Sequence, residues 1–265
     1  RSPSRGLGDV YKRQVKQKQS TCLVEDEWTP VTFREMLQTD LKYGVNTKVF
    51  RFHLHGALQQ AGLAVGQFVA IRGELDGEWL QGYYSPLSRP DEEGYVEILC
   101  RTDTAGGQII NFLNAVRPGG ECYLKAMGGL RLRFEGSQLF HGEREIKKLS
   151  LLAGGTGIAP MIQIVRAYLY HLVGAGAPSG VSLPDPATSG VRLVYASEQE
   201  FDLAFTDILQ SIQNKYPAYF QYYIVLNHPP LGWTEGVGFV NEDTARRKLF
   251  YPYEEEQGQL FVMCG

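Results

Sequence analysis

The chain has 265 residues, enough for two domains of ordinary size, and its 43% apolar and 21% charged residues are typical of a soluble globular protein. A formal net charge of -3 argues against nucleic acid as the main partner, because phosphate binding needs a basic surface. No uninterrupted apolar run approaches the roughly 18 residues that a membrane-spanning helix needs.

The two ends of the chain have unusual features. Residues 1–14, RSPSRGLGDVYKRQ, show no apolar periodicity, and the first methionine is Met36. We therefore expect residues 1–15 to be a non-native or disordered tail and leave them out of the fold prediction. The chain stops at FVMCG, within a predicted strand-to-loop transition. We expect a fragment, with any membrane anchor or further domain beyond its ends.

Residues 16–141 alternate short apolar and polar runs with Gly, Pro and Asp turns. The pattern predicts strands over 47–56, 66–75, 94–101 and 121–134. Strands at this spacing indicate an antiparallel barrel or sandwich. One helix is predicted among them over 106–116, because the segment opens on two glycines and then has apolar residues at helical spacing.

From residue 147 the pattern changes to strands that alternate with helices. Strands are predicted over 147–155, 191–197, 220–227 and 259–264, and helices over 159–173, 201–216 and near 241–250. Such alternation indicates a parallel sheet with helices on its faces. We therefore predict two domains joined by a short linker near 141–146. The first is an antiparallel β-barrel over 16–141, and the second is an α/β parallel-sheet nucleotide-binding domain over 147–265 that is truncated at its C-terminus.

The stretch LLAGGTGIAPM, residues 151–161, places three glycines between a predicted buried strand and a predicted helix. In open parallel sheets, ligands bind beyond the carboxyl ends of the strands. Gly154, Gly155 and Gly157 would let the backbone approach a pyrophosphate, and the positive end of the helix would attract it. Pro160 suits the first helical turn, where a missing N–H costs no hydrogen bond. The alternative is a turn that only packs the helix against the sheet, since the stretch is not G-x-G-x-x-G.

Two further segments could bind a ligand. In GYYSPLSRP, residues 82–90, an aromatic side chain stands next to a hydroxyl at a strand end, where it could stack on a flat ring and hydrogen-bond its edge. The alternative is an ordinary aromatic strand edge. Gly106 and Gly107 open a predicted helix, which makes either a second anion site or an ordinary turn.

The ordered set TKVFRFHL, GLAVGQFVAIRG, GYVEILCR, LLAGGTGIAPM, LVYASEQEFDL, GWTEGVGFVNED and VMCG resembles the ferredoxin–NAD(P) reductase superfamily. Within it, the chain is most similar to the branch of NADH–cytochrome b5 reductases and nitrate-reductase flavin domains, from about residue 42 to residue 265. The resemblance implies an FAD-binding barrel followed by an NAD-binding domain. It also implies an NADH-dependent flavoprotein reductase that passes hydride from NADH to FAD and then single electrons to a haem protein such as cytochrome b5.

The resemblance implies roles for single residues. Tyr84 would flank the flavin ring, and the Ser85 hydroxyl would hydrogen-bond the flavin nitrogen that accepts hydride. Cys264 would lie beside the nicotinamide, although taken alone it is typical of a buried strand cysteine. These three are the implied catalytic residues. The implied cofactor-binding residues are Tyr83, Tyr84, Ser85, Arg101, Gly106, Gly107, Gly154, Gly155, Thr156, Gly157, Pro160, Cys264 and Gly265.

Two positions depart from the family's pattern. Gly82 stands where the family has an arginine on the FAD pyrophosphate, and Ile110 stands where a Ser or Thr hydroxyl adds a phosphate contact. Each lost contact is worth up to about 1–3 kcal/mol. Weaker FAD binding, a displaced adenylate end, FMN in place of FAD, or a flavin-free nucleotide-binding relative are the alternatives. Compensating charge could come from Arg89, Arg101 or Lys125.

The stretch SEQEFD, residues 197–202, follows the second strand of the predicted nucleotide domain and contains three acids and no base. Because a 2′-phosphate needs a basic residue there, we predict NADH over NADPH. We predict no metal site, since His53 and His55, in an H-x-H on one strand, are weak evidence without further ligands. The four cysteines also lack ligand spacing, which indicates free thiols in a reducing compartment.

Five cations, Arg131, Arg133, Arg144, Lys147 and Lys148, could form a basic face for an acidic haem protein, or could be solvated surface charges. The acceptor could also be a fused domain, which would make the chain the terminal reductase module of a larger nitrate-reductase-like or cytochrome-b5-fused flavoprotein. We expect no nucleic-acid partner. We expect a location on the cytoplasmic side, either in solution or attached to a membrane through segments beyond the termini.

Overall fold

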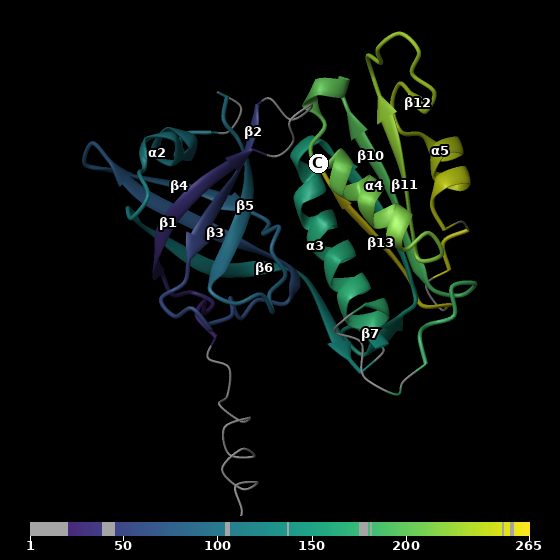
Figure 1. Cartoon of the computed structure of the whole chain (residues 1–265), viewed down its shortest axis with the longest axis horizontal. Coiled ribbons are helices and arrows are strands. Elements are labelled where there is room, and N and C mark those ends of the chain that lie inside the picture. The colour runs from purple at the N-terminus through teal and green to yellow at the C-terminus, as the bar shows by residue number, and fades with distance from the viewer. Residues whose placement is uncertain are drawn as a thin grey trace, which may run out of the picture.

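The structure, a computed structural model, describes residues 21–38, 46–103, 107–136, 138–174, 180, 182–250, 252–254 and 257–265. The expected tail at 1–15 and Gly106 lie outside the described residues. Two β-sheets form two halves of the molecule, and the long helix α3 (Ile158–Tyr168) lies between the first half and the second sheet (Figure 1). None of the described helices has the length and apolar character that a membrane crossing requires.

The first half is an antiparallel sheet in the order β4-β3-β6-β1-β2-β5. Its strands are β1 (Thr29–Gln38), β2 (Thr47–His53), β3 (Val65–Leu75), β4 (Glu78–Tyr84), β5 (Tyr95–Arg101) and β6 (Glu121–Glu135). A bridge between Pro86 and Ile98 brings the chain after β4 to β5, so the two edge strands meet and the sheet nearly closes into a barrel. The predicted barrel is therefore confirmed. β1 is added to the predicted strands, and β4 is the strand whose end was expected at residues 82–90.

Helix α2 (Ile109–Ala115) covers one end of the barrel, so the helix predicted at 106–116 is present and begins at Ile109. Its buried face carries Phe112, whose ring lies against Gly73 of β3. A Cβ at Gly73 would lie 2.2 Å from that ring. Glycine at this strand position therefore lets the helix approach the barrel.

A hairpin links the two halves. β7 (Gln138–His141) pairs with β6, and β8 (Arg144–Ile146) pairs with β7 before the chain enters the second sheet. The residues expected as a linker, 141–146, thus lie at the turn of this hairpin and in its second strand.

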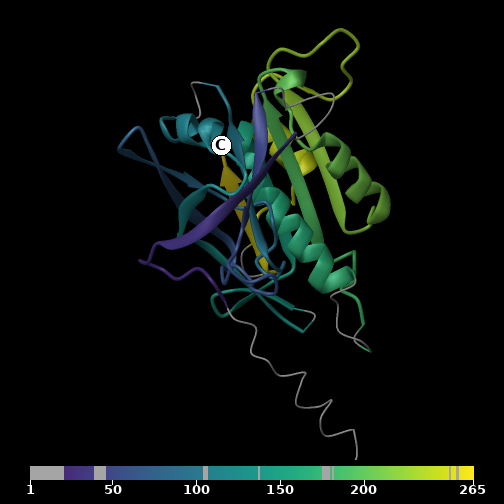
Figure 2. The same cartoon turned by 60° about the vertical axis from the view of Figure 1, so that its left-hand side comes forward.

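The second half is a parallel sheet in the order β12-β11-β10-β9-β13. Its strands are β9 (Lys148–Gly154), β10 (Gly190–Ser197), β11 (Phe220–Leu226), β12 (Gly236–Val237) and β13 (Gln259–Cys264). α3, extended by the π turn η3 (Leu169–Val173), and α4 (Thr206–Lys215) cover one face, and α5 (Glu242–Lys248) covers the other (Figures 1 and 2). This is the predicted α/β domain after the barrel.

The predicted helix at 201–216 begins later than expected. Residues 200–202 form one 3-10 turn, η4 (Glu200–Asp202), and the chain is then extended at Leu203. Phe205 adopts a left-handed conformation with φ of 64°, after which α4 starts at Thr206. The acidic segment is therefore a loop at the edge of the sheet, where its side chains can face a ligand.

The middle of α3 holds the barrel through backbone groups. Gln163 is 1% exposed; its Nε2 donates to the Ser88 carbonyl at 2.9 Å, and its Oε1 accepts from the Gly66 amide at 2.8 Å. Arg166 donates to the Leu87 carbonyl at 3.3 Å and to Glu92 at 2.9 Å. Because both partners of each bond belong to different halves, these bonds fix how the halves sit together.

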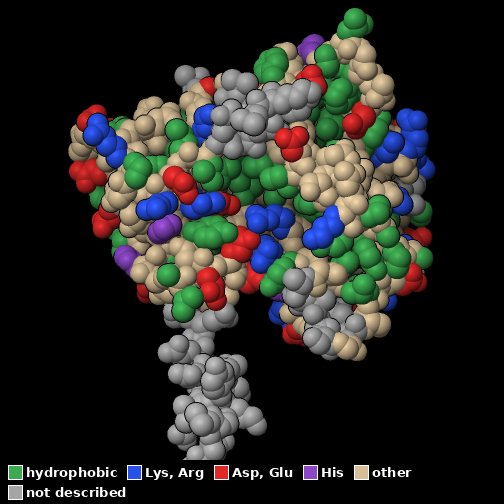
Figure 3. Space-filling model, in the orientation of Figure 1, with side chains coloured by type: hydrophobic (Ala, Val, Ile, Leu, Met, Phe, Trp, Pro, Cys, Tyr) green, Lys and Arg blue, Asp and Glu red, His purple; other side chains and the backbone are tan. Residues whose placement is uncertain are grey.

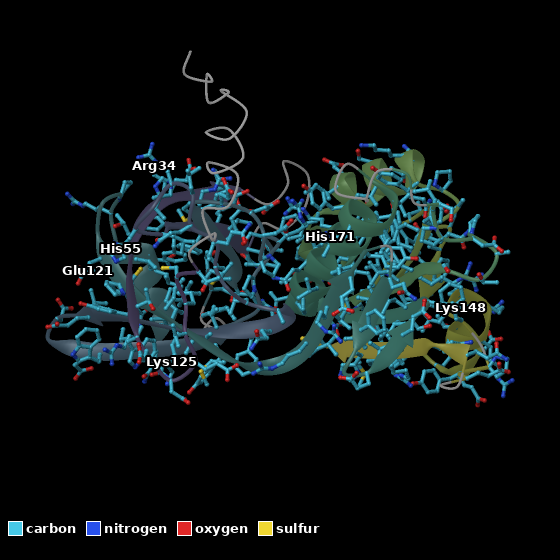
Figure 4. The ribbon with its side chains drawn as sticks, turned by 90° about the horizontal axis from the view of Figure 1, so that it is seen from below. Arg34, His55, Glu121, Lys125, Lys148 and His171 are labelled. Carbon is cyan, nitrogen blue, oxygen red and sulfur yellow. The ribbon has the colours of Figure 1, made fainter. Side chains whose placement is uncertain are left out.

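His171, after α3, extends the same contact (Figure 4). Its Nε2 lies 3.5 Å from a carboxylate oxygen of Asp91, and its ring stacks on Phe134 with centroids 4.6 Å apart. Burial lowers the pKa of His171, Asp91 opposes this shift, and Arg89 adds to it. The imidazole therefore sits neutral in a partly buried polar contact between the halves.

Candidate functional site

Two adjoining cavities open where the carboxyl ends of the parallel strands face the barrel. The central cavity, of about 350 Å³, is lined by Gln81, Gly82, Tyr83, Tyr84, Ser85, Leu99, Arg101, Gly107, Gln108, Ile109, Thr156, Gly157, Ala159, Pro160, Cys264 and Gly265. The sheet-edge cavity, of about 280 Å³, is lined by Asn46, Thr47, Arg101, Gly154, Gly155, Thr156, Ala196, Ser197, Glu198, Asp202, Asn227, Gly238, Phe239 and Val240. Arg101 and Thr156 line both, so the two cavities meet at these residues.

Every described residue that the sequence predicts for cofactor binding lines one of the two cavities. Gly154 and Gly155 line only the sheet-edge cavity, and Arg101 and Thr156 line both. Gly106 lies outside the described residues, whereas Gly107 lines the central cavity with φ of 75° and open space around it. Segments separated by about 180 positions in the chain thus come together at one place.

The glycine loop after β9 serves two purposes. Gly155 has φ of 50°, and a Cβ there would meet nothing within 4 Å, so its backbone is open to a ligand. A Cβ on Gly157 would lie 2.0 Å from the carbonyl oxygen of Cys264, so this glycine packs the start of α3 against the end of β13. The packing interpretation of the sequence therefore holds at Gly157, whereas a pyrophosphate contact at the open backbone of Gly155 stays a prediction.

The two tyrosines at the end of β4 point to different environments. Tyr83 is 59% exposed; its hydroxyl accepts from Gln81 at 2.7 Å and its ring meets the ring of Phe68 edge-on at 6.2 Å. Tyr84 is half-buried against the barrel core, and a hydrogen bond joins its hydroxyl to the thiol of Cys100. Burial raises the pKa of Tyr84, so its hydroxyl stays protonated. Ser85 lines the central cavity beside it.

The space beside Gly82 is filled. A Cβ on Gly82 would lie 2.6 Å from Cγ2 of Ile109 and 2.9 Å from Cε2 of Tyr84. The position therefore lacks a cation and also lacks room for one. Ile110, the second departure from the family's pattern, is 3% exposed and packs in the barrel core, so Ile109 is the isoleucine of α2 that lines the cavity.

Arg101 supplies a positive charge at the meeting point of the cavities. Its guanidinium donates to both carboxylate oxygens of Asp103, at 3.1 and 2.6 Å, and this hydrogen bonding raises the pKa of Arg101. Of the other two candidate cations, Arg89 pairs with Asp91 and Glu92, and Lys125 lies over the ring of Trp28. Figure 4 shows Lys125 on the barrel, away from the centre of the molecule.

Cys264 ends β13 against the glycine loop. It is half-buried and lines the central cavity, next to Gly265, whose Cα lies 3.3 Å from the Cβ position of Gly154. Burial raises the pKa of the Cys264 thiol, so the group is neutral at physiological pH. The thiol can thus border an uncharged ring.

The sheet-edge cavity carries two acids from the loop after β10. Glu198 accepts from Nδ2 of Asn227 at 2.7 Å, and its other oxygen lies 3.3 Å from Nδ1 of His228. Asp202 lines the same cavity. Phe239, which is 80% exposed, lines the same cavity. The sequence prediction assigned no role to Asn227 or Phe239. Asn227 ends a predicted parallel strand, whereas Phe239 follows β12, which the sequence did not predict.

Acids and an aromatic ring accompany three of the cations that the sequence offered either as a basic face or as solvated surface charges. Arg131 pairs with Glu25, Arg133 pairs with Glu135, and Lys148 lies over the ring of Phe250. Figure 3 shows cations and acids interspersed over the visible face. In the described ranges, no three His, Cys, Asp or Glu side chains come together as metal ligands, and His53 and His55 are exposed. The four cysteines are free.

The sequence matches two known families of protein domain. Residues 36–130 match the oxidoreductase FAD-binding domain, and residues 151–265 match the oxidoreductase NAD-binding domain. NADH-cytochrome b5 reductase 1 of Bos taurus is 30% identical over 237 residues, which cover 83% of this chain and 72% of the relative. The human protein of the same name is 28% identical over 276 residues, which cover 98% of this chain and 84% of the relative.

The fold also matches solved structures. The cytochrome b5 reductase domain of Ulva prolifera nitrate reductase superposes with a TM-score of 0.77 at 22% identity, covering 93% of this chain and 90% of that chain. The CS-b5R domains of human Ncb5or superpose with a TM-score of 0.66 at 17% identity, covering 90% of this chain and 62% of that chain. At these identities the matches establish the fold. Together with the bovine relative and the two domain matches, they show that this chain belongs to the NADH–cytochrome b5 reductase family and is an NADH-dependent flavoprotein oxidoreductase that uses FAD.

Proposed function

We propose that FAD binds in the central cavity, that NADH binds along the sheet-edge cavity, and that the nicotinamide enters the central cavity beside Cys264. The observation that carries the proposal is that the two cavities share Thr156 and Arg101, so ligands in them would touch. We also propose that the barrel domain spans 16–141 and the nucleotide domain 147–265.

The residues of the central cavity fit a flavin. The open backbone at Gly107, the hydroxyl of Ser85 and the guanidinium of Arg101 offer donors to a ring edge and to phosphates. Tyr84 and Ile109 provide an apolar wall for a flat ring. FAD, when bound, accepts hydride from NADH and releases single electrons; the protein binds and orients both partners.

We propose that Ser85 donates its hydroxyl hydrogen to the flavin nitrogen that receives hydride, and that Tyr84 supports the ring. Cys264, as a neutral thiol, borders the nicotinamide and excludes water from it. The amides of the Gly154–Gly157 loop and the start of α3 bind the pyrophosphate, because the positive end of the helix dipole faces the open backbone of Gly155. Pro160 in the first turn leaves these amides unaffected.

The choice of nucleotide follows from the sheet-edge cavity. Glu198 and Asp202 would repel a 2′-phosphate, whereas their carboxylates can accept hydrogen bonds from a ribose hydroxyl. Phe239 presents an exposed ring on which an adenine can stack. We therefore propose that NADH is preferred over NADPH.

We propose a haem protein such as cytochrome b5 as the electron acceptor, because several relatives are named NADH-cytochrome b5 reductase. The exposed ring of Tyr83 borders the central cavity from the barrel side, so a protein docked there would lie next to the flavin. We propose the cytoplasmic side as the location, since four free cysteines fit a reducing compartment.

The test is anaerobic mixing of the purified protein with NADH, followed by the flavin absorbance. We expect bleaching within seconds with NADH and a much slower change with an equal amount of NADPH. A protein that binds no flavin, or a flavin that NADH does not bleach, would contradict the proposed site. Steady-state reduction of cytochrome b5 by the same preparation then tests the acceptor. A bleached flavin that leaves cytochrome b5 oxidised would contradict only that part.

A further inference from the structure

Cys100 is a buried cysteine that no predicted role explains. It lies in β5, is 1% exposed, and belongs to the barrel core. We propose that Cys100 is a positioning residue for the flavin. Through its hydrogen bond with the Tyr84 hydroxyl, it holds the ring of Tyr84 as a wall of the central cavity, in the place that a side chain at position 82 would otherwise take. The inference rests on the proposed function, in which the flavin occupies that cavity.

The first step is the geometry of β4. Gly82 and Tyr84 are two positions apart in this strand, so they share one face. A Cβ at Gly82 would lie 2.9 Å from Cε2 of Tyr84 and 3.3 Å from its hydroxyl oxygen. The tyrosine ring therefore leans back over Gly82. With Ile109 2.6 Å from the same Cβ position, the ring and the isoleucine fill the place of a side chain.

The second step is the contact across the barrel's opening. β4 and β5 are the two edge strands, with no ladder of backbone hydrogen bonds between them. The hydrogen bond between the Tyr84 hydroxyl and the Cys100 thiol crosses this seam. Below it, the bridge of Pro86 with Ile98 is the backbone contact at the same seam. The pair thus ties one edge strand to the other beside the cavity.

The third step is what this leaves for the ligand. Because its hydroxyl is bound to Cys100 inside the barrel, Tyr84 offers the cavity its ring. The next residue of β5, Arg101, points the opposite way along the pleat and lines the cavity. Fixing Cys100 therefore fixes both the apolar wall and the neighbouring cation. If Cys100 only filled the core, its removal would not act through the Tyr84 hydroxyl. A core-filling role and a positioning role can therefore be told apart by experiment.

The experiment is a double-mutant cycle on the purified holoenzyme, with FAD release on dilution followed by flavin fluorescence. The variants are Cys100→Ala, Tyr84→Phe, the double variant, and Cys100→Ser, which keeps a hydrogen-bonding group. We expect each single loss to weaken FAD binding about five- to tenfold. We expect the double variant to match the single ones, because both changes remove the same bond. Cys100→Ser should stay within about twofold of the parent.

Cys122→Ala is the matched control, because Cys122 is another fully buried barrel cysteine, whose sulfur contacts the Val31 carbonyl. It should lower the melting temperature as Cys100→Ala does and leave FAD binding unchanged. Gly82→Arg should weaken FAD binding, since the new side chain displaces the Tyr84 ring.

The role of Cys100 would be overturned if the losses of FAD affinity in the two single variants multiplied in the double variant, or if Cys100→Ala kept the parent's FAD affinity. It would also be overturned if Cys100→Ser lost as much affinity as Cys100→Ala, or if Gly82→Arg bound FAD more tightly. These outcomes leave the proposed function intact, because the parent still binds FAD. A parent protein that binds no FAD would overturn both.

Discussion

The glycine loop after β9 and the end of β4 border the same pair of adjoining cavities but are built in opposite ways. In the loop, Gly155 and its neighbours expose bare backbone, and what they offer a ligand is amide groups. At the end of β4, the space beside Gly82 is occupied by Tyr84 and Ile109, so the surface is made of side chains from other elements. One glycine leaves room for a ligand, and the other leaves room for the protein itself.

This difference shows that a glycine in a binding motif has no single meaning. At Gly155 the positive φ and the empty surroundings belong together. At Gly157 and Gly82 the cause is contact with a carbonyl and with two side chains. We expect the two kinds of glycine to respond differently to substitution, and the following predictions test this.

The largest effect is expected for Gly157→Ala. Its Cβ would lie 2.0 Å from the carbonyl oxygen of Cys264, so either α3 or β13 must move. We expect a loss of about 3 kcal/mol in the free energy of unfolding and a strong loss of NADH-driven flavin reduction. Thermal unfolding and NADH titration measure the two. A variant with the parent's melting temperature and NADH affinity would show that the loop is looser than the structure has it.

A smaller effect is expected for Gly82→Ala, because the atoms it meets belong to side chains that can shift. The contact with Ile109 should cost about 1–3 kcal/mol in the free energy of unfolding. In an Ile109→Ala background, Gly82→Ala should cost less than it does in the parent, because the close contact is gone. Gly107→Ala is the control, since only its φ of 75° opposes a side chain and nothing lies within 4 Å. If Gly82→Ala costs as much in the Ile109→Ala background as in the parent, the packing explanation is wrong.

The third prediction concerns charge. Changing Glu198 and Asp202 together to Gln and Asn removes the repulsion of a 2′-phosphate while keeping hydrogen-bonding groups of the same shape. We expect the preference of kcat/KM for NADH over NADPH to fall about tenfold, or about 1.4 kcal/mol. Arg101→Gln is the comparison, since its charge faces both cavities and should weaken both nucleotides alike. An unchanged preference in the double variant would place specificity elsewhere.

The smallest effect is expected in the pH dependence of stability, at the contact of His171 between the barrel and the nucleotide-binding half. The pKa of His171 is lowered from its ordinary value of 6.5, so the unfolded chain takes up a proton before the folded one does. Stability from this group is therefore fully present above about pH 6.5 and falls as the pH drops below it. His171→Gln should flatten the decrease of the melting temperature from about pH 7 to about pH 5.

The groups around His171 give the control for this prediction. Asp91 and Arg89 face the imidazole from the barrel side, Phe134 stacks on it, and Tyr170 meets its ring edge-on. Asp91→Asn removes the attraction that favours the proton, so it should make the acid decrease steeper. An identical pH profile in the parent and in His171→Gln would assign the decrease to other groups.

The helices and strands could be predicted where the sequence has a clear apolar run or a regular spacing of apolar residues. The parallel strands β9, β10 and β11 are apolar runs and were predicted nearly to the residue. β1 is not predicted, and of β4 only the end is, because alternate residues of both strands face solvent. β12 has two residues, too few for any period. The order of the strands in the sheet could not be predicted either, because β4 and β5 become neighbours only when the barrel curves.

The candidate site followed from the sequence where it depends on local backbone. Gly154, Gly155, Thr156 and Gly157 form a continuous motif, and this one segment borders both adjoining cavities. The partnership of Tyr84 with Cys100 joins residues 16 positions apart across an open seam, and no local pattern indicates it. For Gly82 the sequence showed the loss of a charge. Only the structure shows that Ile109 and the Tyr84 ring occupy the place.

The hydrogen bonds from α3 to the barrel have a consequence for exchanging the two halves between related chains. Gln163 binds the amide of Gly66 and the carbonyl of Ser88, and Arg166 reaches the carbonyl of Leu87. These are main-chain groups, which any barrel with the same backbone course presents whatever its side chains. A nucleotide-binding half that carries this glutamine and arginine should therefore dock onto barrels of very different sequence. Exchange of halves between relatives should then depend on these two helix positions and on the side-chain contacts of Arg166 with Glu92 and of His171 with Asp91 and Phe134.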